Sequence, residues 1–503
     1  MGKPTIALSA VAIVLAASLA GTSPAPAGAN ACDNRVNNTF EKLLECVTLD
    51  GVRAHQAALQ AIADANGGNR AAGTPGYAGS ADYVAETLEA AGYDVTLDPF
   101  EVIFTPPETL QQTAPVTATY ETGRFTGSGD GEVAGQVIPV DLALGNSDWP
   151  ADPTFATSGC EASDFAGLDF SGPSDIALIQ RGACFFSVKA VNAEAAGAEA
   201  VVIMNQGNTP DRMGLIVGTV EQLPDGSPSN LTVPVVGASF PNGVALSQAG
   251  AQALVVVDPI ETRVDYNVLA ELPGRNKNNV VMAGAHLDSV PEGPGIQDNG
   301  SGSAALLEIA IQMRKVKPRN TLRFAWWGAE ESGLVGSADY VNGLSPEELD
   351  AIAAYIDVHM IGSPNFVRFV YDGDGSEGGF PGPAGSGAIE QFYADFYTAR
   401  GLPFEPLAFE FRSDYVTFLA AGIPAGGLFT GAEVIKTPDQ VAIYGGTAGD
   451  QFDPCYHLAC DTFDNISLEV LEQNTQATAA AVLQFGMNTE AINGVKGKGN
   501  FKP

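Results

Sequence analysis

The stretch "VVMAGAHLDSVPEGPGIQDNGSGSAALLEIA", residues Val280–Ala310, decides the fold class. Val280–Ala285 is an unbroken apolar run, which is typical of a strand buried on both faces. His286 and Asp288 follow this strand directly, and Asp298 stands in a glycine-flanked turn ahead of a predicted helix of small residues. This order indicates an α/β protein with a mostly parallel central sheet flanked by helices, in which polar side chains gather beyond the carboxyl ends of strands.

A second strand ends in the same way. "NTLRFAWWGAEESGLVGS" contains a predicted strand, Thr321–Trp327, then a glycine turn and the pair Glu330 and Glu331. A solvated acidic turn is the simpler explanation in a chain this acidic, but buried adjacent carboxylates are costly without a cation. With His286 and Asp288 at another strand end, a metal site is favoured. One glutamate could bind the metal while the other takes a proton from water.

The third motif is "FDPCYHLACD", in which Cys455 and Cys460 would close a short loop around Tyr456 and His457. The chain has only 4 histidines, so each needs an explanation. A lone histidine in a loop is more often structural. One that is held rigidly in a disulfide ring beside a tyrosine favours a functional site.

These motifs occur in one order with "MIGSPN" (360–365), "RSDY" (412–415) and "GGLFTGA" (426–432). The set closely resembles the secreted bacterial dizinc aminopeptidases, which are relatives of glutamate carboxypeptidase and the transferrin receptor. The resemblance covers roughly residues 50–105 and 264–488. It implies the zinc exopeptidase fold and the release of N-terminal residues from peptides.

The resemblance also implies a metal centre with two Zn²⁺ ions. Asp298 would bridge the ions, His286 would bind the first, and Glu331 with His457 would bind the second. From the residues alone, the sequence supports a weaker statement, a divalent-metal hydrolase with the number of ions open.

Four further residues receive roles by the same resemblance. Glu330 would act as general base and then as general acid, and Asp288 would hold His286. Tyr456 would stabilise the oxyanion of the tetrahedral intermediate. Arg412 would help to bind substrate.

One position departs from the family. The residue before "MIGSPN" is an aspartate in the family and completes the first zinc site, but it is His359 here. Imidazole is a good zinc ligand, so we favour His359 itself. Asp357, about 6–7 Å away along a strand, could supply the missing charge from behind or ligate after a local backbone shift. A weakened or absent first metal, or a different metal preference, is the third interpretation.

Between the two halves of this resemblance lies an inserted segment with short strand runs, many Gly and Pro, and a helical stretch predicted over Phe185–Asn205. It resembles a protease-associated (PA) domain, with Cys160 and Cys184 where such domains carry a disulfide. The predicted boundaries are a signal peptide at 1–31, a zinc peptidase domain at 32–105 and 264–490, a PA-domain insertion at 106–263 and a flexible tail at 491–503.

The N-terminus predicts export. Lys3 precedes the apolar run Ile6–Ala20 and a series of small residues, which is typical of a secretory signal peptide, so we expect a secreted, extracellular protein. A lipoprotein anchor at Cys32 is disfavoured because no lipobox precedes it. Export favours three disulfides among the 6 cysteines. Of the 15 pairings that six cysteines allow, the sequence favours the adjacent ones: Cys32 with Cys46, Cys160 with Cys184, and Cys455 with Cys460.

The formal net charge of −35 disfavours nucleic acid and anionic membranes as partners. We expect peptide or protein substrates with a free N-terminus, no stable membrane anchor and, by resemblance, a monomer and a preference for large hydrophobic N-terminal residues. A structural Ca²⁺ would suit so acidic a chain, but the sequence assigns no ligands. The alternatives are another zinc exopeptidase of the clan, such as a carboxypeptidase, a one-zinc glutaminyl cyclase, or a peptidase-like binding protein with a weakened site.

Overall fold

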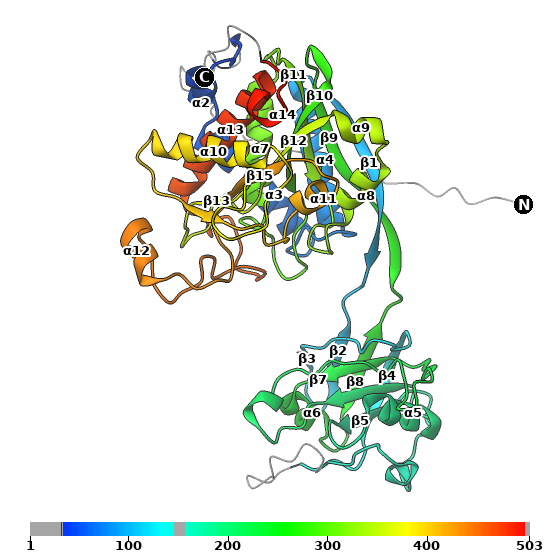
Figure 1. Ribbon diagram of the computed structural model, residues 1–503. Coiled ribbons are helices and arrows are strands. Elements are labelled where there is room, and N and C mark those ends of the chain that lie inside the picture. Colours follow the sequence, from blue (N-terminus) through cyan, green and yellow to red (C-terminus); the bar gives the residue numbers. More distant parts are fainter. Residues whose placement is uncertain (1–31, 33, 145–155, 498–503) are drawn as a thin grey trace, which may run out of the picture. The chain divides into compact units, whose positions relative to one another are not determined.

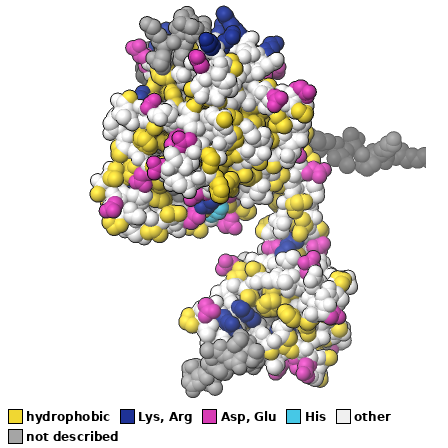
Figure 2. Space-filling model, in the orientation of Figure 1, with side chains coloured by type: hydrophobic (Ala, Val, Ile, Leu, Met, Phe, Trp, Pro, Cys, Tyr) yellow, Lys and Arg dark blue, Asp and Glu magenta, His cyan; other side chains and the backbone are white. Residues whose placement is uncertain are grey.

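The structure is a computed structural model that describes residues 32, 34–144 and 156–497. It divides into two compact units, one formed by Glu101–Arg263 and the other by the chain up to Phe100 and from Val264 onward. The predicted signal peptide, residues 1–31, lies outside the described residues. No helix in the described part of the chain is long and apolar enough to cross a bilayer. Acidic side chains are spread over the visible faces of both units (Figure 2).

The larger unit is built on an 8-stranded sheet with the order β1-β9-β11-β10-β12-β15-β13-β14. Its central strands β11, β10, β12 and β15 run parallel, while β9 and β13 pair antiparallel to their neighbours. The predicted α/β class with a mostly parallel central sheet is therefore confirmed. The strands are β1 (Asp94–Phe104), β9 (Glu261–Leu272), β10 (Asn276–His286), β11 (Asn320–Trp327), β12 (Ile352–Val358), β13 (Phe369–Tyr371), β14 (Glu405–Leu407) and β15 (Ala425–Phe429).

Helices cover both faces of this sheet (Figure 1). One apolar core includes residues of α2 (Phe40–Cys46), α3 (Leu49–Ala65), α4 (Pro75–Ala91), α7 (Gly300–Met313), α10 (Ser386–Thr398) and α13 (Leu468–Met487). The opposite core includes residues of α8 (Val335–Gly343) and α11 (Tyr415–Ala420), and partly buried residues of α9 (Pro346–Ala351) pack against it. Two short helices, α12 (Pro438–Tyr444) and α14 (Glu490–Asn493), follow the last strands.

The chain stays ordered beyond the predicted domain boundary at 490. Ile492 in α14 is buried in the larger core, and the side-chain amide of Asn493 donates to that of Asn279 at 2.7 Å. The flexible tail predicted from 491 therefore begins with packed residues, because the apolar side chain of Ile492 finds a place in the core.

The smaller unit contains a 7-stranded sheet with the order β3-β2-β8-β4-β5-β6-β7 and few helices, so it is β-rich as expected. Its elements are β2 (Thr109–Ala114), β3 (Ala118–Tyr120), β4 (Gly131–Pro139), η1 (Ala162–Phe165), β5 (Asp175–Gln180), α5 (Phe186–Ala196), β6 (Ala200–Met204), η2 (Pro210–Arg212), β7 (Val235–Ala238), α6 (Phe240–Leu246) and β8 (Gln252–Val257). The helix predicted over Phe185–Asn205 is too long. It ends at Gly197, whose φ is 106°, and the β-branched run that follows forms β6.

Helix α7 is tied to the end of β12 through Asn299, its N-cap residue. The Asn299 Oδ1 atom accepts the N–H of Gly302 at 3.0 Å and the N–H of Met360 at 2.9 Å. Its Nδ2 atom donates to the carbonyl of Val358 at 2.9 Å. A glycine is needed at 302, because a Cβ there would lie 2.0 Å from the Val358 carbonyl oxygen.

We predict that Gly302→Ala lowers the free energy of unfolding by about 2–3 kcal/mol, since the added methyl group forces α7 and β12 apart. The matched control is Gly343→Ala in α8, where a Cβ would meet nothing within 4 Å. Chemical denaturation of both variants measures the difference. Equal stability of the two variants would contradict the close approach.

Candidate metal and catalytic site

Three neighbouring parallel strands bring the candidate side chains to one edge of the sheet. β10 ends at His286, and β12 is followed by His359. β11 is followed after a short turn by Glu330 and Glu331. Because β11, β10 and β12 are adjacent and parallel, their carboxyl ends meet, and the polar residues that follow them converge.

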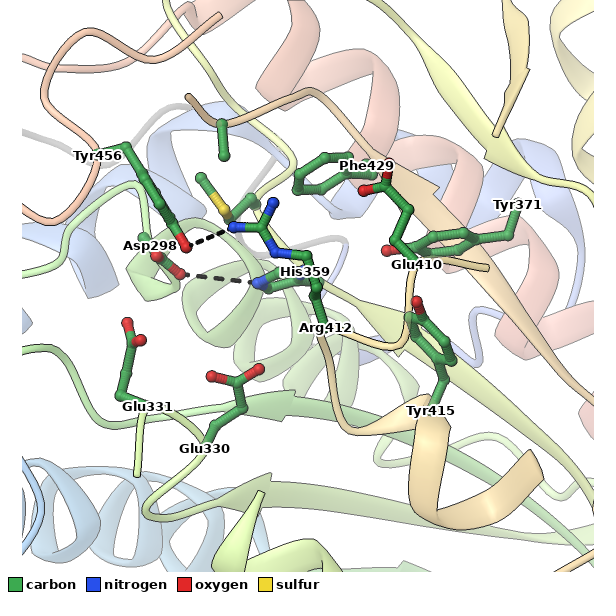
Figure 3. A pocket seen from close by; sticks show the side chains of 12 residues that line it. Asp298, Glu330, Glu331, His359, Tyr371, Glu410, Arg412, Tyr415, Phe429 and Tyr456 are labelled. Atoms are coloured by element: carbon green, nitrogen blue, oxygen red, sulfur yellow. Dashed lines mark hydrogen bonds and ion pairs between the residues drawn. The ribbon is translucent and has the colours of Figure 1, made fainter. Parts of the chain in front are cut away.

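Asp298 lies at the centre of this convergence, and its two carboxylate oxygens face different imidazoles. Figure 3 shows the contact of Asp298 with one of them, His359. Oδ1 lies 3.2 Å from Nε2 of His286 and 3.7 Å from Nε2 of His359. Oδ2 lies 3.3 Å from Nε2 of His457. The same His457 nitrogen lies 3.1 Å from Oε2 of Glu331. The partners of Asp298 thus form two sets, one at Oδ1 with His286 and His359, and one at Oδ2 with His457 and the neighbouring Glu331.

The donor atoms in this cluster fit divalent metal ions. Nε2 of His286, Oδ1 of Asp298, Oε1 of Glu331 and Nε2 of His457 are buried, yet none makes a hydrogen bond with a described residue. Ligand atoms of His286, Asp298 and Glu331 lie within 4.8 Å of one another. Buried polar atoms that converge without hydrogen bonds are costly, whereas imidazole and carboxylate donors are ligands that zinc prefers.

His359, and not Asp357, lies at this cluster. Ligand atoms of His286, Glu330 and His359 lie within 4.8 Å of one another, whereas Asp357 belongs to no such group among the described residues. Asp357 lies within β12, where it pairs with Gly284 and Gly427 of the flanking strands. Its Oδ2 atom is buried and unpaired among the described residues. His359 therefore lies among the candidate ligands, and Asp357 lies behind it as a buried carboxyl group.

The environment of His359 also suits metal binding. Burial lowers the pKa of its imidazole, and the nearby His286 lowers it further, although Asp298 opposes both. The neutral ring is the form that binds a metal. One face of the ring stacks on Phe429, with the centroids 5.4 Å apart and the planes at 15°.

Asp288 does more than the sequence predicted. Its Oδ1 atom lies 3.6 Å from Nδ1 of His286, as expected for a residue that orients the ring. The carboxylate also accepts the backbone N–H groups of Glu330 at 3.1 Å and Glu331 at 3.3 Å. One buried carboxylate therefore positions the histidine at one strand end and the glutamate pair at the next.

The glutamate pair has raised pKa values. Burial raises the pKa of the Glu330 carboxyl well above its ordinary value, and the charges of Asp414, Glu331 and Asp298 add to this against the opposing effect of His286. Burial, together with Asp298, raises the pKa of Glu331 to about 7. A carboxyl group that holds a proton more tightly than usual is a better base near neutral pH.

Tyr456 and Arg412 form one wall of the site. Cys455 and Cys460 are joined by a disulfide, and within that loop the Tyr456 ring stacks on His457 with centroids 3.8 Å apart. Arg412 donates to the Tyr456 hydroxyl at 3.0 Å and to both carboxylate oxygens of Glu433.

The other two disulfides join Cys32 to Cys46 and Cys160 to Cys184.

Two positioning residues lie outside the functional roles assigned from the sequence. Asp461 accepts the backbone N–H groups of Gln297 at 2.8 Å and Asp298 at 3.0 Å, so it links the disulfide loop to the turn that carries Asp298. The signal for Asp461 was its place directly after "CYHLAC". The second is Arg70, which nothing in the sequence marked.

Arg70 is fully buried, and its guanidinium donates to the backbone carbonyls of Leu287, Pro294 and Gly295. It therefore holds the segment that joins Asp288 to the turn carrying Asp298.

A third group of carboxylates, Asp372, Asp374 and Glu390, also has ligand atoms within 4.8 Å of one another. Asp372 accepts the N–H groups of Ser376 and Glu377, and Glu390 accepts that of Gly373. Because backbone donors already satisfy these carboxylates, the group gives no support to the expected Ca²⁺.

Comparison with known proteins identifies a peptidase family and a PA domain in this chain. Peptidase family M28 matches residues 267–482, and the PA domain matches residues 134–246. An aminopeptidase of Pseudomonas aeruginosa is 48% identical over 460 residues, which are 90% of this chain and 83% of that protein.

Two solved structures are similar over most of their length. The aminopeptidase from Aneurinibacillus sp. strain AM-1 has a TM-score of 0.51 and 28% identity, with 92% of this chain and 98% of that chain covered. BSAP, a zinc aminopeptidase from Bacillus subtilis, has a TM-score of 0.55 and 25% identity, with 86% and 94% covered.

We predict that the metal-free protein loses stability as pH rises from about 4 to about 8. Burial is the largest cause of a raised pKa in four carboxyl groups. The pKa is raised to about 7 in Glu331 and Asp414, and to about 8 in Asp357 and Asp461. These carboxyls are ordinarily near 4. The folded chain therefore holds protons that the unfolded chain has released, and the free energy of unfolding falls through this window.

Zinc should reverse this trend, because metal binding requires deprotonated ligands. Thermal unfolding of chelator-treated and zinc-loaded protein between about pH 5 and pH 8 tests both statements. We expect the Tm of the chelated protein to fall and the Tm gain from zinc to grow. A Tm gain from zinc that does not change with pH would contradict the assignment.

Proposed function

The chain belongs to peptidase family M28 and is a zinc-dependent aminopeptidase; we propose that it acts outside the cell and uses two zinc ions. Membership follows from the identity to the aminopeptidase of Pseudomonas aeruginosa over most of both chains. The two-metal proposal rests on the surroundings of the two carboxylate oxygens of Asp298. His286 and His359 lie at one oxygen, and His457 lies at the other. Glu331, close to His457, completes the second set.

In this proposal His286, His359 and Asp298 hold the first zinc, and Asp298, Glu331 and His457 hold the second. Zinc in such a site supplies a Lewis acid for the peptide carbonyl and lowers the pKa of water. A histidine in place of an aspartate leaves the ligand set one unit more positive. That charge would lower the pKa of Asp357, which is about 8 in the metal-free chain, so that its carboxylate balances the charge from behind. Ligation by Asp357 after a backbone shift remains the alternative.

Glu330 is the proposed general base. It takes a proton from the attacking water and returns it to the amine that leaves as the peptide bond breaks. The raised pKa of its carboxyl suits both transfers. Asp288 supports this role, because it accepts the Glu330 N–H and thereby fixes the turn.

Tyr456 is the proposed donor to the oxyanion. Its hydroxyl accepts a hydrogen bond from Arg412, which leaves the phenolic proton available for the substrate carbonyl oxygen. Arg412 itself pairs with Glu433 on both carboxylate oxygens. An arginine already engaged in this way is a poor receptor for a substrate C-terminus, which counts against the carboxypeptidase alternative.

Recognition of the substrate N-terminus is proposed to depend on Glu330. A histidine that ligates zinc at position 359 has no acceptor left for the α-ammonium group, so Glu330 is the remaining acidic partner on that side. The aromatic side chains of Tyr371, Tyr415 and Phe429 line the same cavity and suit large hydrophobic N-terminal residues.

The remaining proposals concern the whole chain. We propose export through the signal peptide at 1–31, which the disulfides support. The peptidase domain at 32–105 and 264–490, the PA domain at 106–263, a monomeric state and the absence of a stable membrane anchor also stay proposals. A binding protein with a decayed site is disfavoured, because the position that departs from the family carries another metal-binding side chain.

We predict that Glu330→Ala lowers kcat by about 10³-fold or more while zinc content is unchanged, since the general base is lost and the ligands remain. Hydrolysis of leucine p-nitroanilide and elemental analysis of the purified variant measure the two effects. The N-acetylated substrate, which lacks a free amine, is the control and should not be cleaved. Turnover near that of the wild type would refute the assignment of Glu330.

We predict that His359→Asp retains or raises aminopeptidase activity and keeps two zinc ions per chain, because aspartate is also a zinc ligand and restores the negative charge. The control is Asp357→Asn, which should leave zinc content intact if His359 is the ligand. A large loss of both zinc and activity in His359→Asp would favour a structure-specific role for the histidine.

A further inference from the structure

The cavity beside the proposed metal site continues away from Asp298 toward a carboxylate that has no role so far. Glu410 and Arg412 line the cavity that contains Asp298, Glu330 and His359. The same two residues line an adjoining cavity that reaches Phe452. In Figure 3, Glu410 lies beside Tyr371, on the opposite side of His359 from Glu331. Glu410 is therefore shared by both cavities.

The walls between the metal site and Glu410 are aromatic. Phe429 stacks on His359 at one end and faces Phe369, with centroids 6.4 Å apart, at the other. Tyr371 packs on Tyr415, with centroids 4.8 Å apart. A substrate side chain that leaves the reacting centre beside His359 would therefore run along apolar ring faces before it reaches a polar group.

Among the described residues, the Glu410 carboxylate has neither a hydrogen bond nor an ion pair, and it is exposed to solvent. The nearest cation that shares its cavity, Arg412, donates to Glu433 and Tyr456 instead. Burial raises the pKa of Tyr371 well above its ordinary value, and the charges of Glu410 and Glu330 both add to this rise. The Glu410 carboxylate therefore acts on a ring that lines the cavity.

The backbone fixes the loop that presents Glu410. The next residue, Phe411, has a φ of 59°, which is rare for a residue other than glycine. Its N–H donates to the Tyr415 hydroxyl at 2.9 Å, which ties the loop to a buried ring of the cavity wall. The carboxylate is thus held on a defined turn and not on a free loop end.

We propose that Glu410 makes the pocket select N-terminal residues that combine a long apolar stem with a positive tip, namely lysine and arginine. The stem would pack on Phe429 and Tyr371, and the ammonium or guanidinium group would meet the unpaired carboxylate. This inference rests on the proposed aminopeptidase function and adds a charge preference to the hydrophobic one. It assigns Glu410 to the side chain of the first residue and leaves the α-ammonium to Glu330.

The test compares kcat/KM for lysine and norleucine p-nitroanilides, which share a four-carbon stem but differ in the charged tip. We expect Glu410→Gln to lower the lysine-to-norleucine ratio about tenfold, since a partly exposed charge-assisted pair is lost. Glu410→Lys should lower the ratio further by repulsion. The control Glu347→Gln removes the same charge from an exposed position in α9 and should leave the ratio unchanged.

Three outcomes would overturn the inference. An unchanged ratio in Glu410→Gln would show that the carboxylate does not meet the side chain. An equal fall for both substrates would assign Glu410 to the α-ammonium group. An equal fall of the ratio in Glu347→Gln would indicate a long-range charge effect. Failure of the proposed function is distinguishable, because the wild type would then cleave neither substrate, whereas failure of the Glu410 assignment leaves cleavage intact.

Discussion

The site depends on the cost of burying carboxylates without a cation. Asp298 is almost fully buried, and Glu330 and Asp288 are buried with it. In a low-dielectric interior such groups either take up protons or gather positive charge. Three imidazoles face Asp298, but within the described part of the chain hydrogen bonds satisfy neither Nε2 of His286 nor Oδ1 of Asp298. Divalent metal binding would resolve this conflict. Burial is also the first cause that raises the pKa of Glu330, the proposed general base.

The fold supports this arrangement through a few buried polar clamps. Asn299 ties the start of α7 to the end of β12, so Asp298 and His359, which flank these contacts, are held together. Asp461 ties the same turn to the disulfide loop that carries His457. Asp288 joins the ends of β10 and β11. Each clamp links segments far apart in sequence, which explains how ligands from distant parts of the chain reach one point.

The substitution at position 359 shifts the balance between metal and substrate. An aspartate there would offer negative charge to both, whereas the imidazole offers only a lone pair. In the larger unit, the carboxyl groups nearby are Asp357, within the strand that precedes His359, and Glu410, which lines the same cavity as His359. Stacking of His359 on Phe429 joins the proposed metal centre to the aromatic wall of the cavity.

The sequence by itself determined the α/β class, the insertion and the residues at the strand ends. Buried strands appear in the sequence as apolar runs, and their ends appear as polar residues near glycine turns. It did not decide whether His359 or Asp357 is the ligand, since residues two positions apart on one face of a strand lie only about 6–7 Å from each other. It also missed Arg70, the second function of Asp288 and the unpaired carboxylate of Glu410. Only tertiary structure decided these points, because each depends on which distant backbone or side chain lies opposite, and no local pattern records that.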